Sequence, residues 1–297
     1  MNRRGFVRNT IFSAGALTLM NSSLFAAFAG EPWKIRMLTD DIGIFYEKGG
    51  TIAFLITKEG IVVVDSEFPE QAKNLISELK KRSDYPFKML INTHHHGDHT
   101  SGNIEFKGIV EHVIGHENCL INHRRVAELQ KNTDKQLFAD TTFSDTWKVN
   151  VGNEKIKAHY FGAGHTNGDV VVHFQHANIA HVGDLVFNRR YAFVDRSAGA
   201  NISSWIDVLD KIKNTFDNGT MFVFGHAYDP DQVVGTTSDL SAMQHYLSKL
   251  LRFADREIRA GKSKDAIIKE KEIPGLRGWK GDGIERGLQA AYEELTA

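Results

Sequence analysis

The segment His94-His95-His96-Gly97-Asp98-His99 is the feature that most constrains how this chain folds. It follows Phe87–Thr93, a run whose apolar residues predict a buried strand. Metal-binding side chains occupy positions 94, 96, 98 and 99, and Gly97 permits a tight turn between them. A loop at the end of a strand can direct 94 and 96 into one site, and 98 and 99 into an adjacent one. Because zinc takes imidazole and carboxylate ligands, the segment predicts a zinc site rather than a surface histidine tract.

Three later segments also place a metal-binding side chain just after a predicted strand. They are Gly164-His165 after Lys155–Tyr160, Gly183-Asp184 after Ile179–His181, and Gly225-His226 after Met221–Phe224. A single segment of this kind more often carries a structural histidine than a ligand. Four such segments in one chain favour a shared metal site.

Hydrophobic periodicity predicts alternating strands and helices before a helical tail. Further predicted strands are Trp33–Leu38, Ile52–Thr57, Ile61–Asp65, Lys148–Val151 and Val170–Phe174, and the predicted helices are Pro69–Arg82, Glu117–Lys131 and Ile202–Phe216. From Asp239 onward the pattern is wholly helical and includes helices at Lys264–Glu270 and Asp282–Leu295. No proline-rich linker precedes this tail, so we expect it to pack on the same domain.

The order and spacing of the metal-binding residues resemble the metallo-β-lactamase superfamily. The matching motifs are His-x-His-x-Asp-His at 94–99, Gly-His at 164–165, Gly-Asp at 183–184 and Gly-His at 225–226. The resemblance spans residues from about 50 to 230 and implies an α/β fold, a four-layer αβ/βα sandwich with its site at one edge between two sheets. We expect residues 30–235 to form this domain and residues 236–297 to form a helical C-terminal extension.

The resemblance also implies a set of ligands for two zinc ions per chain. It places the first ion on His94, His96 and His165, the second on Asp98, His99 and His226, and Asp184 between both. Asp65 ends an early predicted strand and is expected to orient the histidine loop from behind the ligands. Asp98 and Asp184 are the expected catalytic carboxylates. Two such ions can share a water, lower its pKa from 15.7 towards about 7, and provide a bridging hydroxide as nucleophile.

The expected reaction is hydrolysis of an ester, lactone, thioester or amide-type bond in a small-molecule substrate. A β-lactamase is one alternative, although Asp184 stands where the best-studied subclass has a cysteine, and Phe187 stands where that subclass has a lysine. An iron enzyme resembling persulfide dioxygenases, with His94, His165 and Asp184 as ligands, is another. The third alternative is a metal-binding module without catalytic activity.

The segment after Asp184 contains the candidate substrate-binding residues Asn188, Arg189, Arg190 and Tyr191. If this loop lines the site, its arginines can hold an anionic group of the substrate. The alternative is a solvated loop with two surface arginines. We expect His95 to point away from the metals, and Trp147, Trp205 and Trp279 to belong to the core.

Residues 1–29 have the pattern of an export signal. Arg3 and Arg4 precede a moderately apolar stretch that ends in Ala27-Phe28-Ala29, a small-x-small cleavage pattern. The paired arginines resemble a twin-arginine signal, and a general secretory signal is the alternative. We therefore expect the secretion machinery as a partner, cleavage near Ala29, a periplasmic location and no stable membrane anchor afterwards.

Composition excludes two further classes of protein. A net charge of -1 and a pI near 6.9 argue against binding nucleic acid through bulk positive charge. A single cysteine, Cys119, excludes an intramolecular disulfide framework, and we expect its thiol to be packed.

Overall fold

The first sheet is built around a run of buried β-branched residues. Each residue of strand β4 (Gly60–Val64) is buried, as expected of a strand covered on both faces. β4 pairs antiparallel with β3 and parallel with β5, within the strand order β1-β2-β3-β4-β5-β6-β7. The other strands are β1 (Lys34–Met37), β2 (Ile42–Tyr46), β3 (Ile52–Thr57), β5 (Phe87–Ile91), β6 (Val110–His116) and β7 (Thr141–Phe143).

A second sheet has the strand order β15-β13-β11-β10-β9-β8. Its strands are β8 (Thr146–Val151), β9 (Glu154–Tyr160), β10 (Val170–Phe174), β11 (Ile179–His181), β13 (Met221–Val223) and β15 (Val234–Gly235). β8 to β11 pair antiparallel in succession, and β11 pairs parallel with β13. A separate parallel pair joins β12 (Phe187–Asn188) to β14 (His226–Ala227), so the segment after Asp184 lies beside His226.

The computed structural model describes residues 33–297, so the predicted export signal lies outside the described residues. The helices are α2 (Pro69–Arg82), α3 (Gly97–Thr100), α4 (Glu117–Leu129), α5 (Ile202–Thr215), α6 (Thr237–Arg259), α7 (Lys264–Ile267) and α8 (Ile284–Leu295). Short 3-10 helices occur at Ser101–Phe106, Thr133–Lys135, Gly183–Leu185, Arg196–Ala198 and Pro230–Gln232. None of these described helices combines the length and the apolar character that a membrane crossing requires.

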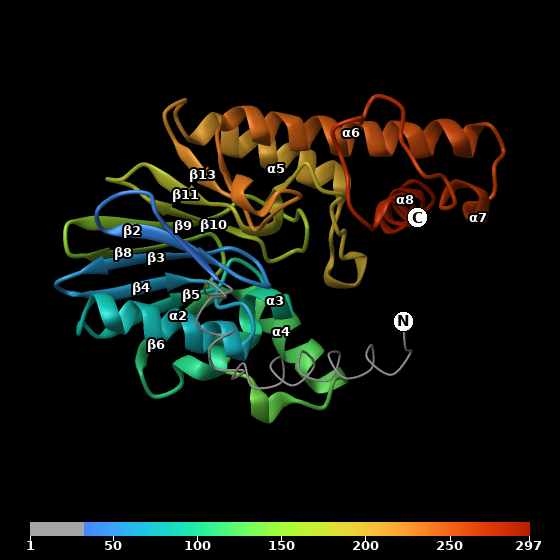
Figure 1. Cartoon of the computed structure of the whole chain (residues 1–297). Coiled ribbons are helices and arrows are strands. Elements are labelled where there is room, and N and C mark those ends of the chain that lie inside the picture. The colour runs from blue at the N-terminus through green and yellow to red at the C-terminus, as the bar shows by residue number, and fades with distance from the viewer. Residues whose placement is uncertain (1–32) are drawn as a thin grey trace, which may run out of the picture. The chain divides into compact units, whose positions relative to one another are not determined.

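Residues Ile35–Ala297 form one compact unit. Two apolar cores lie between its layers. Val62 of β4 and Val172 of β10 belong to the core that both sheets share. Val171 points to the opposite face of β10, into a second core with Trp205 of α5 and Leu247 of α6. Figure 1 shows α2 and α4 outside the first sheet, and α5 and α6 outside the second. The predicted α/β four-layer αβ/βα sandwich is therefore confirmed.

Several predicted elements have the observed bounds, and six strands were not predicted. Four predicted elements are confirmed residue for residue: the helix at Pro69–Arg82 and the strands at Ile52–Thr57, Val170–Phe174 and Ile179–His181. The missed strands are β2, β6 and β7, and the two-residue strands β12, β14 and β15. Glycines interrupt the apolar runs of β2 and β6, and β7 is only three residues long.

The prediction of a wholly helical tail was wrong. No helix is present between residues 268 and 283, where Pro274 and several glycines favour turns. This irregular segment instead runs beside the loop that follows Asp184. The Tyr191 N–H donates to the Lys280 carbonyl over 3.1 Å, and the Lys280 N–H donates to the Arg189 carbonyl over 3.0 Å. The C-terminal extension thus supports a loop that borders the predicted site.

Candidate metal centre

The histidine segment leaves the first sheet where two parallel strands end. β4 and β5 are parallel neighbours, so Asp65 after β4 and the loop after β5 emerge at the same edge. Asp65 accepts hydrogen bonds from the Thr93 N–H (2.8 Å), the Thr93 hydroxyl (2.7 Å) and His99 Nδ1 (2.8 Å). This buried carboxylate therefore ties the start of the histidine loop to His99 in α3.

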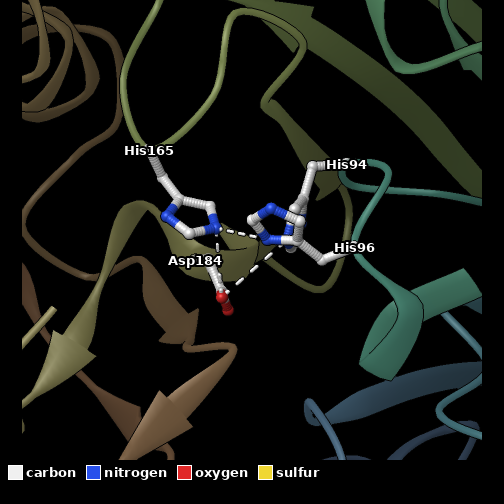
Figure 2. Close-up of side chains that lie close together, drawn as sticks. All are labelled: His94, His96, His165 and Asp184. Atoms are coloured by element: carbon white, nitrogen blue, oxygen red, sulfur yellow. Dashed lines mark hydrogen bonds and ion pairs between the residues drawn. The ribbon is translucent and has the colours of Figure 1, made fainter. Parts of the chain in front are cut away.

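His94, His96, His165 and Asp184 form the first group of potential ligands. Each offers one ligand atom, and these atoms all lie within 4.8 Å of one another. His96 Nδ1 lies 3.2 Å from His94 Nε2 and 2.8 Å from His165 Nε2. In Figure 2 the rings of His94 and His96 face that of His165, with the Asp184 carboxylate below them. Three imidazole nitrogens and one oxygen around a single point match the donor set of a zinc site.

Asp98, His99 and His226 form the second group. His226 Nε2 lies 3.0 Å from Asp98 Oδ2, and His99 Nε2 lies 3.8 Å from the same oxygen. Asp184 Oδ1 lies 3.1 Å from His99 Nε2 and 3.5 Å from His226 Nε2. Its other oxygen, Oδ2, lies 3.4 Å from His165 Nε2 and 3.8 Å from His94 Nε2 in the first group. Among the residues that the structure describes, Asp184 is thus the carboxylate whose two oxygens face different groups.

Hydrogen bonds behind the rings determine which nitrogen faces the centre. His165 Nδ1 donates to the Phe193 carbonyl over 2.7 Å, and His99 Nδ1 donates to Asp65. The Thr93 hydroxyl donates to Asp65, so its oxygen accepts from His94 Nδ1 over 3.0 Å. In all three histidines Nδ1 is engaged by these partners, so Nε2 is the nitrogen that would bind a metal.

The protonation states also suit a cation. Burial, together with the neighbouring His96, lowers the pKa of His165 to about 4, and burial lowers the pKa of His94 well below its usual range. Burial opposes ionisation of Asp184, yet His226 and His99 hold its pKa well below the usual value. His99 Nε2 and Asp184 Oδ1 are buried without a hydrogen-bond partner among the described residues. Burial opposes protonation of His99, yet Asp184, Asp65 and Asp98 raise its pKa well above the usual value, so a metal would replace a proton there. Neutral His94 and His165 and an ionised Asp184 suit a bound metal directly.

A cavity of about 500 Å³ opens beside Asp98 and His226. Its walls include Lys48 and Phe68, which the sequence analysis did not identify, and Arg190, which it did. The Glu67 carboxylate accepts the backbone N–H groups of residues 47, 48 and 49, over 3.0, 2.9 and 2.6 Å. These bonds fix Lys48 at the wall, although nothing near Lys48 in the sequence signals this contact.

Of the four candidate substrate-binding residues, only Arg190 lines this cavity. The Asn188 amide donates to the Gln232 carbonyl over 2.9 Å, and the Arg189 guanidinium lies 3.5 Å from Asp239. Tyr191 lines a different cavity, of about 530 Å³, with Trp279 and the irregular segment of the extension. The geometry therefore gives no support for substrate contacts by Asn188, Arg189 or Tyr191 at this centre.

The three tryptophans considered in the sequence analysis pack in or against the apolar cores. Trp205 is fully buried behind His165, and its indole N–H donates to the Leu185 carbonyl over 3.0 Å. Trp279 is buried and stacks on Tyr246, while Trp147 packs half-buried on the core between the sheets. His95 belongs to neither ligand group above, and its Nε2 lies 3.7 Å from Asp195.

Comparisons with known proteins agree with this geometry. The family model described as the metallo-beta-lactamase superfamily matches residues 47–226, a range that contains the whole candidate centre. The metallo-beta-lactamase IND-1 of Chryseobacterium indologenes is 28% identical over 178 residues, covering 58% of this chain and 70% of that relative.

Solved structures show the same fold. A metallo-beta-lactamase from Pontibacter korlensis superposes with a TM-score of 0.61 at 22% identity, covering 73% of this chain and 99% of that one. A double mutant of the sec-alkyl sulfatase PisA1 superposes with a TM-score of 0.69 at 11% identity, covering 88% of this chain and 50% of that one. The two neighbours differ in the activity that their names give, so the shared fold does not select a substrate.

Proposed function

The chain belongs to the metallo-β-lactamase superfamily, and we propose that it is a dinuclear zinc hydrolase acting on an ester, lactone, thioester or amide-type bond. The observation that carries this proposal is the position of Asp184, with one oxygen toward each group of histidines. When bound, a pair of zinc ions supplies an activated water and polarises the bond that it attacks.

The residues of the chain would bind the metals, transfer a proton and hold the histidine loop in place. His94, His96 and His165 would hold the first ion, Asp98, His99 and His226 the second, and Asp184 both. Asp98 lies in the cavity wall with its side chain 32% exposed. Its carboxylate can therefore reach the substrate and carry a proton to the leaving group. Asp65, through Thr93 and His99, would keep the histidine loop in place.

The charges in the cavity favour a substrate that carries an anionic group near the bond to be cleaved. Lys48 and Arg190 both line the cavity. Its carboxylates are Asp98, a proposed ligand, and Glu47, which accepts hydrogen bonds from the Gln71 and Asn74 amides. Among the described residues, neither side chain forms an ion pair, and Lys48 Nζ only lies over the Phe68 ring at 5.8 Å from its centroid. Two unneutralised cations beside the proposed zinc centre would bind a carboxylate or a similar anion.

A β-lactamase is the second candidate, because the relative IND-1 is named as one. β-Lactam antibiotics carry a carboxylate close to the ring amide, which would suit the two cations. Asp184 and Phe187 still stand where the best-studied β-lactamase subclass has cysteine and lysine. The export signal at residues 1–29, the secretion machinery as a partner and the periplasmic location stay predictions, since those residues lie outside the described part.

The zinc-loaded protein without residues 1–29 should be assayed on a panel of neutral and anionic esters, lactones, thioesters and the β-lactam nitrocefin. We expect turnover of at least one carbonyl substrate that is lost with a chelator and restored by zinc. Turnover of nitrocefin above the other substrates would establish the second candidate. Iron content with oxygen consumption on a persulfide, or bound metal without any turnover, would contradict hydrolysis.

The double substitution K48A/R190A is expected to raise KM for anionic substrates roughly tenfold, since each lost cation weakens one charge-assisted contact. The kcat value should change little, because neither residue belongs to the proposed ligand set. KM for a neutral ester of the same size should stay within about twofold. Lys80→Ala, an exposed lysine in α2, is the matched control for lost charge. Equal KM changes on neutral and anionic esters would contradict the anionic preference.

A further inference from the structure

His96 is oriented differently from the other histidines of the first group. It turns Nδ1, not Nε2, toward His94 and His165. Its Nε2 points away from the centre and lies 2.9 Å from Asp195 Oδ2. An imidazole can present a lone pair at Nδ1 only when its proton sits on Nε2. The partner of Nε2 therefore decides whether His96 can act as a ligand in this orientation.

Asp195 is held so that one oxygen is reserved for this contact. Its Oδ1 accepts the Ser197 hydroxyl over 2.6 Å and the Ala198 N–H over 3.2 Å. Its own N–H donates to the His165 carbonyl over 3.2 Å. The side chain is 11% exposed, so water competes little for Oδ2. With Oδ1 occupied and the backbone tied to His165, Oδ2 is presented to His96.

The same short segment supports a second histidine of the first group. The Phe193 carbonyl accepts His165 Nδ1 over 2.7 Å, and the Phe193 ring lies 5.5 Å from the His96 ring. Arg286 of α8 lies over the outer face of the Phe193 ring, 5.5 Å from its centroid. Residues 193–195 thus contact two histidines that come from different parts of the chain, and Arg286 of the C-terminal helix contacts the same segment.

We propose that Asp195 is a positioning residue for the first metal site: its Oδ2 accepts a hydrogen bond from the Nε2–H of His96, which keeps the Nδ1 lone pair directed at the metal. The inference rests on the proposed function, because it takes His96 as a metal ligand. A carboxylate behind a ligand also raises the basicity of the imidazole, so its removal weakens metal binding as well as ring orientation. No local pattern around Asp195 predicts this role.

The neighbouring histidine offers another interpretation of the same residues. His95, His96 and Asp195 each place one ligand atom within 4.8 Å of the others, so they could hold a metal themselves. That third site would need His96 Nε2, which is already within hydrogen-bond distance of Asp195. His95 Nε2 lies 3.7 Å from Asp195 Oδ2, beyond hydrogen-bond distance. Because His96 Nδ1 already faces the first group, a third ion on Nε2 would require one imidazole ring to bind two metals, which favours positioning over a third metal.

The test compares metal binding by the wild type, Asp195→Ala, Asp195→Asn and Asp140→Ala. Asp140 is the matched control, because it contacts an exposed histidine, His112, over 3.3 Å and lies outside both ligand groups. Zinc affinity is measured by competition with a chromophoric chelator, and cobalt substitution reports the ligand geometry through the visible spectrum. The melting temperature of the metal-free proteins shows whether each variant folds.

We expect Asp195→Ala to weaken one of the two zinc-binding steps by about 10–100-fold, and to leave the other within about threefold. Asp195→Asn keeps an acceptor oxygen of lower basicity, so we expect a smaller loss and an altered cobalt spectrum. Asp140→Ala should match the wild type. If Asp195→Ala does not fold, the spectrum and affinity of Asp195→Asn decide the question.

Wild-type affinities and spectrum in both Asp195 variants would overturn the proposal. A third zinc equivalent in the wild type that is lost in Asp195→Ala would overturn it in favour of a third site. Failure of the wild type to bind any metal would instead overturn the proposed function.

Discussion

Asp184→Ala is expected to lose both metal ions and to lower hydrolytic activity by roughly 10³-fold or more. Metal-derived stabilisation of a transition state is worth several kcal/mol, and each 1.36 kcal/mol corresponds to a factor of ten in rate. Substitution of Asp184 should affect both metal ions, because one of its oxygens lies 3.1 Å from His99 Nε2 and the other lies 3.4 Å from His165 Nε2. Loss of any single histidine would affect only one group.

The isosteric Asp184→Asn separates charge from shape. It keeps the size of the buried side chain but removes the negative charge that balances two cations, so we expect it to retain at most one metal ion. Metal content by elemental analysis, together with kcat/KM on the best substrate of the panel, measures both effects. Asp207→Ala, an exposed carboxylate on α5, is the control for loss of an acidic residue. Two zinc equivalents in Asp184→Ala would contradict the bridging position.

The grouping of the proposed ligand residues could be predicted from the sequence, because each follows a strand that the apolar pattern reveals. β4 and β5 are parallel, and so are β11 and β13, so the segments after each pair leave its sheet at the same edge. The position of a ligand thus follows from the local sequence together with the order of the strands. The shared edge explains why residues about 130 positions apart, His94 and His226, reach one centre.

The supporting residues could not be predicted, because their positions depend on contacts between distant segments. Lys48 reaches the cavity wall because the Glu67 carboxylate binds the backbone of its loop. Asp195 reaches His96 through a turn that ends in Gly199 at φ +75, where an L side chain would be strained. Arg190 was identified, but only the structure separates it from Arg189, which lies against Asp239. Contacts between distant segments leave no hydrophobic periodicity in the sequence from which they could be predicted.

Close approach to the centre adds a constraint that is visible only in three dimensions. A Cβ atom at Gly50 would lie 2.1 Å from the His99 ring, so this position accepts only glycine while His99 keeps its place. From the sequence alone, the Gly49-Gly50 pair predicts only a turn. In the structure it lets the loop that carries Lys48 pass directly over one of the predicted ligands.

Removal of the metal is expected to lower the melting temperature by on the order of 10 °C. Zinc at about a thousand times its dissociation constant stabilises the folded state by about 4 kcal/mol. For a domain of this size, 1 kcal/mol shifts the melting temperature by roughly 2–4 °C. Without metal, the buried His99 Nε2 and Asp184 Oδ1 lie 3.1 Å from each other and lose the ion that would bind both, which costs free energy relative to the metal-bound state.

Thermal unfolding with zinc and with excess chelator measures this shift, and Asp184→Ala provides the internal comparison. The variant lacks the carboxylate between the two groups, so its melting temperature should change little when the chelator is added. A shift equal to that of the wild type would show that the chelator acts elsewhere on the protein. Equal melting temperatures of the wild type in zinc and in chelator would show that His94, His99 and Asp184 are packed together for a reason other than metal binding.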